Sequence, residues 1–274
     1  MLDNAHWKVL LKFVSCLMLA GLGLAAQAQD KPPTAEKPKV KPIRALLITG
    51  GCCHDYEKQK KIITEGISSR ALVEWEIVHQ GGTATNSKIP YYENADWAKG
   101  FDIVVHNECF SDIPDPKWTD RVLKPHREGT PAIVIHCAMH CYRDKTEEWF
   151  KFLGVTSHQH GAHYPFEVVN VAEKHPIMQG FGKVWLTPKG ELYQIAKLWD
   201  TATPLAYAMS RETLKKEPCV WVNQYGKTRV FGTTIGHYNE EVSDPVFLNL
   251  VTQGLLWATD KQQDEYRQPF LKPK

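Results

Sequence analysis

The sequence has no excess of charge of one sign. Its 274 residues include 33 Lys and Arg against 31 Asp and Glu, which gives a formal net charge of +2. The basic residues are interspersed with acidic ones and form no stripe, so the phosphate-neutralising surface of a nucleic-acid-binding protein is missing. We therefore expect no nucleic-acid partner.

Long hydrophobic runs are absent after residue 28. The one apolar stretch, FVSCLMLAGLGLAA at 13–26, follows Lys8 and Lys12 and ends in the small-x-small pattern Ala26-Gln27-Ala28. It is shorter than the roughly 20 apolar residues of a spanning helix. We expect residues 1–28 to be a signal peptide, the protein to be secreted or periplasmic, and no stable membrane insertion after cleavage. An uncleaved anchor is the alternative.

The sequence also lacks internal repeats and any sign of a second domain. Residues 29–42, QDKPPTAEKPKVKP, are rich in Pro and Lys and predict an extended linker. The chain is 43% hydrophobic, enough for a full core. We expect one folded domain at 43–262 and a C-terminal tail at 263–274; the oligomeric state stays open.

Apolar runs alternate with helical patterns in the first half of the chain. Such alternation favours a parallel sheet covered by helices, so the predicted fold class is a three-layer α/β domain with a mostly parallel central sheet. The expected strands are 43–49, 73–79, 102–106, 131–136 and 165–171, and the expected helices include 116–128 and 245–259. Residues 155–165 are expected to form a His-rich loop. The segment CVWVNQYGKTRVFGTTI is expected to form two strands with a turn at 225–228.

Several familiar motifs are missing: the sequence contains neither HExxH nor CxxC, and GGCCHD at 50–55 matches no dinucleotide or P-loop fingerprint. Imidazoles, in contrast, gather directly after the predicted strands. In open parallel sheets ligands bind outside the carboxyl ends of the strands, so we expect a functional site at that edge. The residues concerned are His54, His106, His136, His140 and His237, with Glu240 and Glu241 close behind the last.

A divalent metal ion is one use for these imidazoles. His136 and His140 have the i,i+4 separation that would place two ligands on one helical face. The segment SHQHGAHYPF brings His158, His160 and His163 within six residues, which is typical of a metal site or of a hydrophilic loop.

A thiol nucleophile is a second possibility. Cys137 follows a buried strand, and His136 or His140 would serve as its base. The alternative for Cys137 is a structural role or a disulfide with Cys52, Cys53 or Cys109, while Cys141 is expected to be structural.

General acid–base chemistry on a polar small molecule is the third possibility. Imidazole titrates near neutrality, and a carboxylate of Glu191 or Glu108 would orient it. Aromatic residues such as Tyr193 and Tyr238 would suit the apolar face of a sugar ring, or would simply pack in the core. Candidate substrate-binding residues are Gly50, Gly51, His54, Glu108, Tyr193 and Tyr238.

The order of motifs resembles the ThuA-like, or trehalose-utilisation, family from about residue 43 to 260. The motifs are LLITGGCCHDYE, IHCAMH, HxHGxHxPF, HPIMQGF, GELY, WVNQYGKTRVFGTTIGHYNE and LVTQGLLWA. This resemblance implies a class I glutamine amidotransferase-like, flavodoxin-like architecture and a role in carbohydrate metabolism. Amidotransferase relatives hold a nucleophilic Cys where this chain has His136. The family's DELY reads GELY here, so Glu191 is retained and an Asp is lost at Gly190.

We therefore predict an exported enzyme that hydrolyses or isomerises a disaccharide or an oxidised sugar derivative. The expected catalytic residues are His136, His237, Glu191 and His140, and the expected partner is a small-molecule sugar. The alternatives are a non-catalytic carbohydrate-binding or sensing protein and a Cys-dependent hydrolase.

Overall fold

The computed structural model describes residues 40–268. The predicted signal peptide, most of the predicted linker and the last residues of the tail lie outside the described residues. The first strand of the described residues starts at Ile43.

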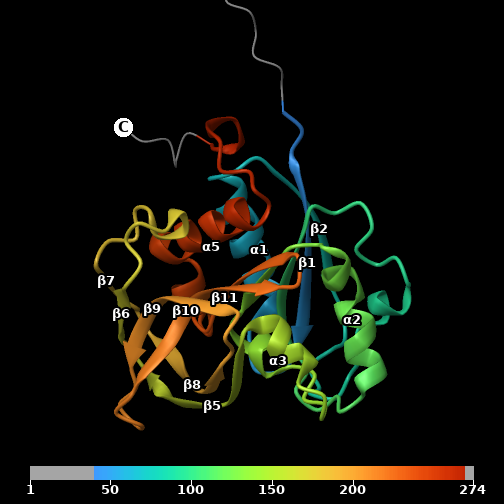
Figure 1. The fold of residues 1–274 in the computed structure, drawn as a ribbon, viewed down its shortest axis with the longest axis horizontal. Coiled ribbons are helices and arrows are strands. Elements are labelled where there is room, and N and C mark those ends of the chain that lie inside the picture. Colours follow the sequence, from blue (N-terminus) through green and yellow to red (C-terminus); the bar gives the residue numbers. More distant parts are fainter. Residues whose placement is uncertain (1–39, 269–274) are drawn as a thin grey trace, which may run out of the picture. The chain divides into compact units, whose positions relative to one another are not determined.

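A nine-stranded sheet forms the centre of the domain (Figure 1). Its strand order is β2-β1-β3-β4-β11-β10-β9-β6-β7. The first five strands in that order are parallel and the remaining pairs are antiparallel. The strands are β1 (Ile43–Gly51), β2 (Val73–His79), β3 (Ile103–Cys109), β4 (Ala132–Ile135), β6 (Glu167–Asn170), β7 (Val184–Leu186), β9 (Ala202–Met209), β10 (Lys216–Tyr225) and β11 (Thr228–Thr233). The predicted α/β fold class is confirmed.

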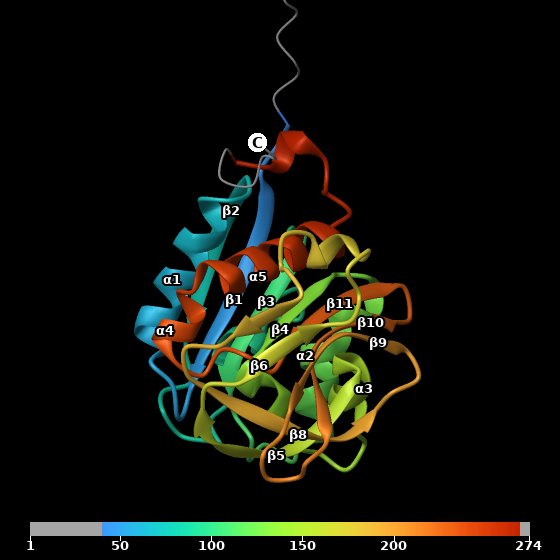
Figure 2. The same ribbon diagram turned by 90° about the vertical axis from the view of Figure 1, so that its left-hand side faces the viewer.

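Helices cover both faces of the parallel half, which gives three layers (Figures 1 and 2). One core cluster joins the sheet to α1 and α5, and a second joins its other face to α2 and α3. The α-helices are α1 (Tyr56–Ser68), α2 (Pro116–Glu128), α3 (Glu148–Leu153), α4 (Asn239–Val242) and α5 (Pro245–Ala258), and the 3-10 helices are η1 (Pro90–Glu93), η2 (His136–His140), η3 (Pro176–Met178) and η4 (Asp264–Tyr266).

Local sequence signals set the helix starts. Asp55, Asp115 and Asp244 precede α1, α2 and α5, and each carboxylate accepts hydrogen bonds from backbone N–H groups of the first turn. Proline at the first position supports α2 and α5 because its missing N–H has no helical partner there. Within residues 40–268, every helix is too short or too polar to span a bilayer.

A separate two-stranded sheet pairs β5 (Val155–Tyr164) with β8 (Gly190–Leu198) (Figure 2). The expectation of a His-rich loop at 155–165 is therefore wrong. Its backbone groups are satisfied by antiparallel pairing with β8, and three register shifts interrupt the alternation that marks a strand in sequence.

Glycine at the end of β1 permits a close approach of three strands. Gly51 has a φ of +103°, and a Cβ there would lie 2.2 Å from the carbonyl oxygen of Cys109 on β3. A Cβ on Gly50 would lie 2.1 Å from the carbonyl oxygen of Gln80, just after β2. Both glycines are thus needed for backbone packing.

The domain continues beyond the predicted end at 262. Residues after η4 pair with the segment before β2, because the N–H of Leu72 donates to Tyr266 and Ala71 forms a bridge with Arg267. At least the first half of the predicted tail therefore belongs to the domain.

Candidate functional site

Three imidazoles and one carboxylate converge at the carboxyl edge of the parallel strands. His54 follows β1, His136 follows β4 and His237 follows β11, while Glu191 comes from the start of β8 in the second sheet. One donor atom from each lies within 4.8 Å of every other. The structure therefore brings together three of the four predicted catalytic residues and His54, predicted to bind substrate.

Nδ1 of His237 is the centre of this cluster. It lies 3.0 Å from Nε2 of His54 and 3.2 Å from Nε2 of His136. Oε2 of Glu191 lies 3.4 Å from the same nitrogen and 3.3 Å from Nε2 of His136. A single proton on Nδ1 of His237 can serve only one of these three neighbours, so the arrangement has more acceptors than donors.

The opposite nitrogens of two rings fix this orientation. Nδ1 of His136 donates to the carbonyl oxygen of Thr234 at 2.6 Å, and Nδ1 of His54 donates to the carbonyl oxygen of Cys52 at 3.2 Å. The ring of His136 therefore presents an unprotonated Nε2 to the cluster, and His54 does the same when its Nδ1, which also lies 3.0 Å from the hydroxyl group of Tyr56, carries the proton. An imidazole held by a backbone carbonyl on one nitrogen is the usual arrangement of a metal-ligating histidine.

Burial sets the charge states of the cluster. It lowers the pKa of His54 to about 2, with further lowering from His136 and His237, and it also lowers the pKa of His136. Burial raises the pKa of Glu191, but the close contacts of its carboxylate with the imidazoles of His136 and His237 outweigh burial and hold that pKa well below its usual range. Two neutral imidazoles beside an ionised carboxylate are the forms that bind a divalent cation.

The spacing of the four atoms fits such an ion. A metal held tetrahedrally at about 2.0–2.1 Å from nitrogen and oxygen ligands separates its donors by about 3.3 Å. Four of the six separations between the donor atoms run from 3.0 to 3.4 Å, and the two from Nε2 of His54 to the donor atoms of His136 and Glu191 lie within 4.8 Å. Nitrogen donors with one carboxylate suit zinc and neighbouring transition ions.

The second oxygen of Glu191 faces the outer imidazoles. Oε1 lies 2.7 Å from Nε2 of His163 and 3.1 Å from Nδ1 of His160, both on β5. Nδ1 of His163 is 2.5 Å from the hydroxyl group of Tyr238. The side chains of His160 and His163 are 46% and 38% exposed, so this side of the carboxylate is open to a ligand.

Glu241 holds the loop that carries His237. Its Oε2 accepts hydrogen bonds from the N–H groups of Gly236 and His237, each at 2.9 Å. The side chain is fully buried, which raises its pKa to about 8. A Cβ on Gly190 would lie 2.6 Å from Oε1 of Glu241, so Gly190 leaves room for this carboxylate where the family's DELY motif has Asp. Sequence reasoning identifies Glu241 as a carboxylate close after His237 but assigns it no role, and it does not identify Thr234.

His140 and His158 lie apart from the cluster. Nε2 of His140 is 3.0 Å from Oγ of Ser157, and its ring stacks on Tyr193 at 4.1 Å between centroids. The expected helical face shared with His136 does not form, because residues 136–140 adopt a 3-10 helix with three residues per turn. His158 is exposed and contacts the ring of Phe150, so the expected three-histidine metal set is divided.

Four of the predicted substrate-binding residues are buried: Gly50 and Gly51 in the strand packing described above, and Glu108 and Tyr193. Glu108 is fully buried, and its Oε1 accepts hydrogen bonds from Tyr92 and Tyr142 and lies 2.9 Å from Nδ1 of His106. It offers no surface to a substrate in this structure. Tyr193 is 1% exposed, but its hydroxyl group lies 3.3 Å from Nε2 of His136, so it contacts the cluster from the protein interior.

Cys137, the predicted nucleophile, has no free thiol in this structure. Cys137 is bonded to Cys109, and Cys52 is bonded to Cys53. Cys141 is a free but buried thiol, and burial raises its pKa well above the usual value. The alternative of a Cys-dependent hydrolase is therefore wrong for this state of the protein, since Cys137 has no free thiol.

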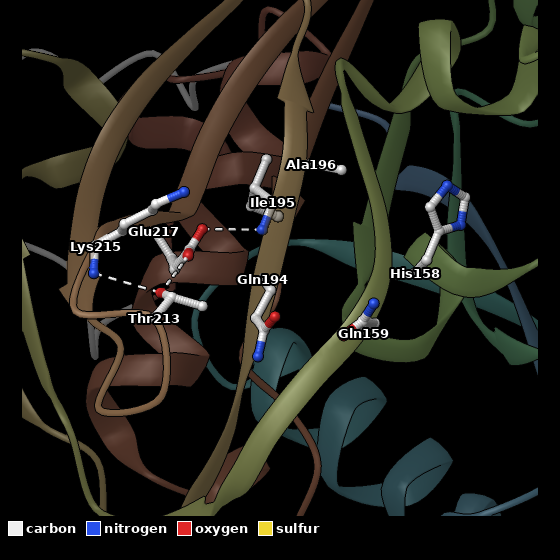
Figure 3. A pocket seen from close by; sticks show the side chains of 8 residues that line it. All are labelled: His158, Gln159, Gln194, Ile195, Ala196, Thr213, Lys215 and Glu217. Atoms are coloured by element: carbon white, nitrogen blue, oxygen red, sulfur yellow. Dashed lines mark hydrogen bonds between the residues drawn. The ribbon is translucent and has the colours of Figure 1, made fainter.

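A polar groove of about 220 Å³ lies beside β5 and β8 (Figure 3). His158 stands on one side of it and Thr213, Lys215 and Glu217 stand on the other. Glu217 accepts hydrogen bonds from the N–H of Ile195 and the hydroxyl group of Thr213. None of the four converging residues lines the groove, which separates it from the imidazole cluster.

The order of the parallel strands, with helices on both faces of the sheet, is that of a glutamine amidotransferase-like fold, in which His136 directly follows β4. The chain belongs to the ThuA family, described as trehalose utilisation, which matches residues 44–258. The predicted family is thereby confirmed.

Solved structures support the same fold. A ThuA-like protein from Parabacteroides merdae is 20% identical with a TM-score of 0.68, covering 80% of this chain and 90% of that one. A ThuA-like protein from Bacteroides uniformis is 18% identical with a TM-score of 0.61, covering 89% and 100%. A cytoplasmic protein from Salmonella typhimurium is 13% identical with a TM-score of 0.53, covering 78% and 98%. Among curated proteins, none matches this chain.

Proposed function

We propose that this protein is a divalent-metal-dependent enzyme of carbohydrate metabolism that hydrolyses or isomerises a sugar derivative. The observation that carries the proposal is the convergence of Nε2 of His54, Nε2 of His136, Nδ1 of His237 and Oε2 of Glu191. Membership of the ThuA family supports a carbohydrate substrate.

The four residues would hold the ion, and a bound cation would polarise a carbonyl or hydroxyl oxygen of the sugar. Thr234 and Glu241 act on the ligands themselves. The Thr234 carbonyl keeps the proton of His136 on Nδ1, and the Glu241 carboxylate fixes the backbone of His237. Both contacts hold the ligands in place before substrate arrives, so little reorganisation is needed.

His163 is the group placed to move a proton. It touches Glu191 through Nε2 and Tyr238 through Nδ1, and it is far more exposed than His136. An imidazole between a carboxylate and a hydroxyl group can accept a proton from one atom of the substrate and return it to another atom. Both hydrolysis and isomerisation require such a transfer. Tyr238 would also offer its ring to the sugar.

Export belongs to the same proposal. The N-terminal segment has the features of a signal peptide, and two disulfides in the domain suit an oxidising compartment. The predicted secreted or periplasmic location therefore remains our proposal.

The test combines metal analysis with a product assay. The purified protein is analysed for bound metal and then incubated with trehalose, other disaccharides and their keto derivatives, with chelator and after metal is restored. We expect one ion per chain, product formation that chelator abolishes, and recovery on adding the metal.

His163→Ala and His158→Ala provide a matched pair. Both replace a partly exposed imidazole on β5, but only His163 touches Glu191. We expect His163→Ala to lose turnover and His158→Ala to keep it. Tight sugar binding without product under every metal tested would instead establish the non-catalytic carbohydrate-binding protein.

A further inference from the structure

Four cysteine sulfurs lie directly beside the imidazole cluster. Cys52 and Cys53 form a disulfide between consecutive residues just after β1, and Cys109 and Cys137 join the end of β3 to η2. Figure 2 shows β1, β3 and β4 side by side, so these sulfurs share one edge of the sheet. Sγ of Cys52 is 3.5 Å from Sγ of Cys109, which brings the two disulfides into contact.

Access to solvent decreases along this row of sulfurs. Cys53 is exposed and Cys52 is half-buried, whereas Cys109 and Cys137 are 3% and 8% exposed. A thiol in solution can therefore reach the Cys52–Cys53 disulfide, but the Cys109–Cys137 disulfide is shielded from it. The contact between Cys52 and Cys109 is the connection between the two.

The buried sulfurs of Cys109 and Cys137 lie next to the candidate metal ligands. Cys53 immediately precedes His54, and Cys137 immediately follows His136. The donor atoms of His54, Cys109 and Cys137 all lie within 4.8 Å of one another. A thiol released at Cys137 would thus stand next to the imidazoles.

We propose that the four cysteines form a thiol–disulfide relay that carries reducing equivalents from an external dithiol to Cys137. This relay is a second, redox-active site, distinct from the sugar chemistry proposed above. Its substrate is a dithiol reductant, and inside the protein the reaction leaves a free thiolate of Cys137 beside His54.

The first step takes place at the exposed disulfide. The dithiol gives up two electrons and two protons and becomes a disulfide, while the Cys52–Cys53 bond breaks and yields two thiols. The second step is internal exchange. Cys52 loses its proton to solvent and attacks Sγ of Cys109, so the Cys52–Cys109 bond forms, the Cys109–Cys137 bond breaks, and the electron pair leaves on Cys137. No further oxidant or reductant is consumed.

A coupling to the metal follows, and this part rests on the proposed function. While Cys137 is bonded to Cys109, the candidate ligands are nitrogen and oxygen only. After exchange, a thiolate at Cys137 joins them, and thiolates favour softer ions than carboxylates do. The oxidation state of the relay would then change the affinity and identity of the bound ion.

Peptide mapping tests the relay without reference to any metal. The purified protein is treated with one equivalent of dithiothreitol, the thiols are alkylated, and the disulfides are located by mass spectrometry. We expect a Cys52–Cys109 cross-link with alkylated Cys53 and Cys137. Alkylation confined to Cys52 and Cys53, with the Cys109–Cys137 disulfide intact, would overturn the relay.

The double variant Cys52→Ser/Cys53→Ser and the single variant Cys219→Ala separate the relay from general reduction. Cys219 is a buried free thiol in the core cluster that joins the sheet to α1 and α5. We expect the double variant to protect the Cys109–Cys137 disulfide at least about tenfold longer in dithiothreitol, because both sulfurs that lie near Cys109 are gone, and Cys219→Ala to behave like the wild type. Equal rates of loss in both variants would contradict the proposal.

Cobalt binding tests the coupling. We expect the cobalt-loaded wild type to gain a sulfur-to-cobalt charge-transfer band after one equivalent of dithiothreitol, and Cys137→Ser to gain none. If the exchange occurs and cobalt binds without such a band, the coupling fails. If the protein binds no cobalt or other divalent ion, the proposed function fails while the relay still stands on the peptide map.

Discussion

The carbonyl oxygen of Thr234 accepts a hydrogen bond of 2.6 Å from Nδ1 of His136. Thr234 follows β11 and His136 follows β4, so the bond joins the ends of two neighbouring parallel strands. It leaves Nε2 of His136 without a proton and directed at His237 and Glu191. The backbone of one strand thus decides which nitrogen the next strand offers to a ligand.

The first prediction concerns the metal ligands. Replacing His237→Ala or Glu191→Gln removes one of four converging donors, so we expect affinity for a divalent ion to fall at least about 100-fold. His158→Ala, which lies outside the cluster, should leave affinity unchanged. Titration of the metal-free protein against a competing chelator measures all three. Equal losses in His237→Ala and His158→Ala would place the ion elsewhere.

The second prediction concerns Glu241. Its carboxylate accepts the N–H groups of Gly236 and His237, whereas the neighbouring Glu240 is exposed. Because Glu241→Ala removes the single oxygen that accepts both N–H groups, it should displace His237 and weaken metal binding about tenfold or more. Glu240→Ala is the matched control and should bind normally. Circular dichroism would confirm that both variants are folded, and normal binding by Glu241→Ala would remove the positioning role.

The third prediction concerns the glycine turn. Gly51→Ala would place a Cβ 2.2 Å from the Cys109 carbonyl oxygen, while Gly82→Ala, also at positive φ, would meet nothing within 4 Å. We expect Gly51→Ala to cost at least about 2 kcal/mol more than Gly82→Ala. For a domain of this size that lowers the unfolding midpoint by roughly 2–4 °C per kcal/mol. Thermal melts of the two variants measure the difference, and coincident melts would mean that the strands can separate at little cost.

The fourth prediction concerns pH. His126 is fully buried, with Nε2 3.0 Å from Nε2 of His106 and Nδ1 2.7 Å from the carbonyl oxygen of Thr130. Burial, and then the neighbouring His106, lowers the pKa of His126 to about 3 from 6.5. The unfolded chain binds this proton more tightly, so the stabilisation is complete above about pH 6.5 and is lost as the pH falls toward 3, by about 1.4 kcal/mol per pH unit.

His126→Gln tests this dependence because a glutamine keeps a donor and an acceptor but cannot be protonated in this range. Urea unfolding is followed between about pH 7 and pH 4.5, with chelator present so that metal release does not contribute. The variant should be less stable at neutral pH and its stability should change less steeply on acidification. An identical slope in both proteins would show that His126 does not titrate on unfolding.

The parallel half of the fold could be predicted because its signals are local. The apolar run at 43–49 and the helical pattern at 116–128 identify β1 and α2 without reference to the rest of the chain. β5 could not, since its alternation is broken at three register shifts that depend on pairing with β8. β8 itself went unassigned, although Glu191 on it was named.

Only part of the site follows from the sequence. Of the five imidazoles expected at this edge, His54, His136 and His237 converge, because parallel strands bring their carboxyl ends to one edge. His106 instead lies within β3 and contacts the buried His126, and His140 contacts Ser157. His160 and His163 contact Glu191, whereas His158 does not. This difference could not be predicted, since the register shifts of β5 decide which of its side chains face Glu191. His136 adopts a φ of +47°, so the helical spacing to His140 did not hold either.

The candidate ligands come from two different sheets. His54, His136 and His237 are fixed to the large sheet, whereas Glu191, His160 and His163 arrive on the β5–β8 pair. An insertion or exchange confined to that pair would replace the carboxylate and both outer imidazoles together and leave the inner three untouched. Because β6 and β7 of the large sheet separate β5 from β8 in the chain, such a change involves two segments, while the inner three imidazoles keep a support of their own.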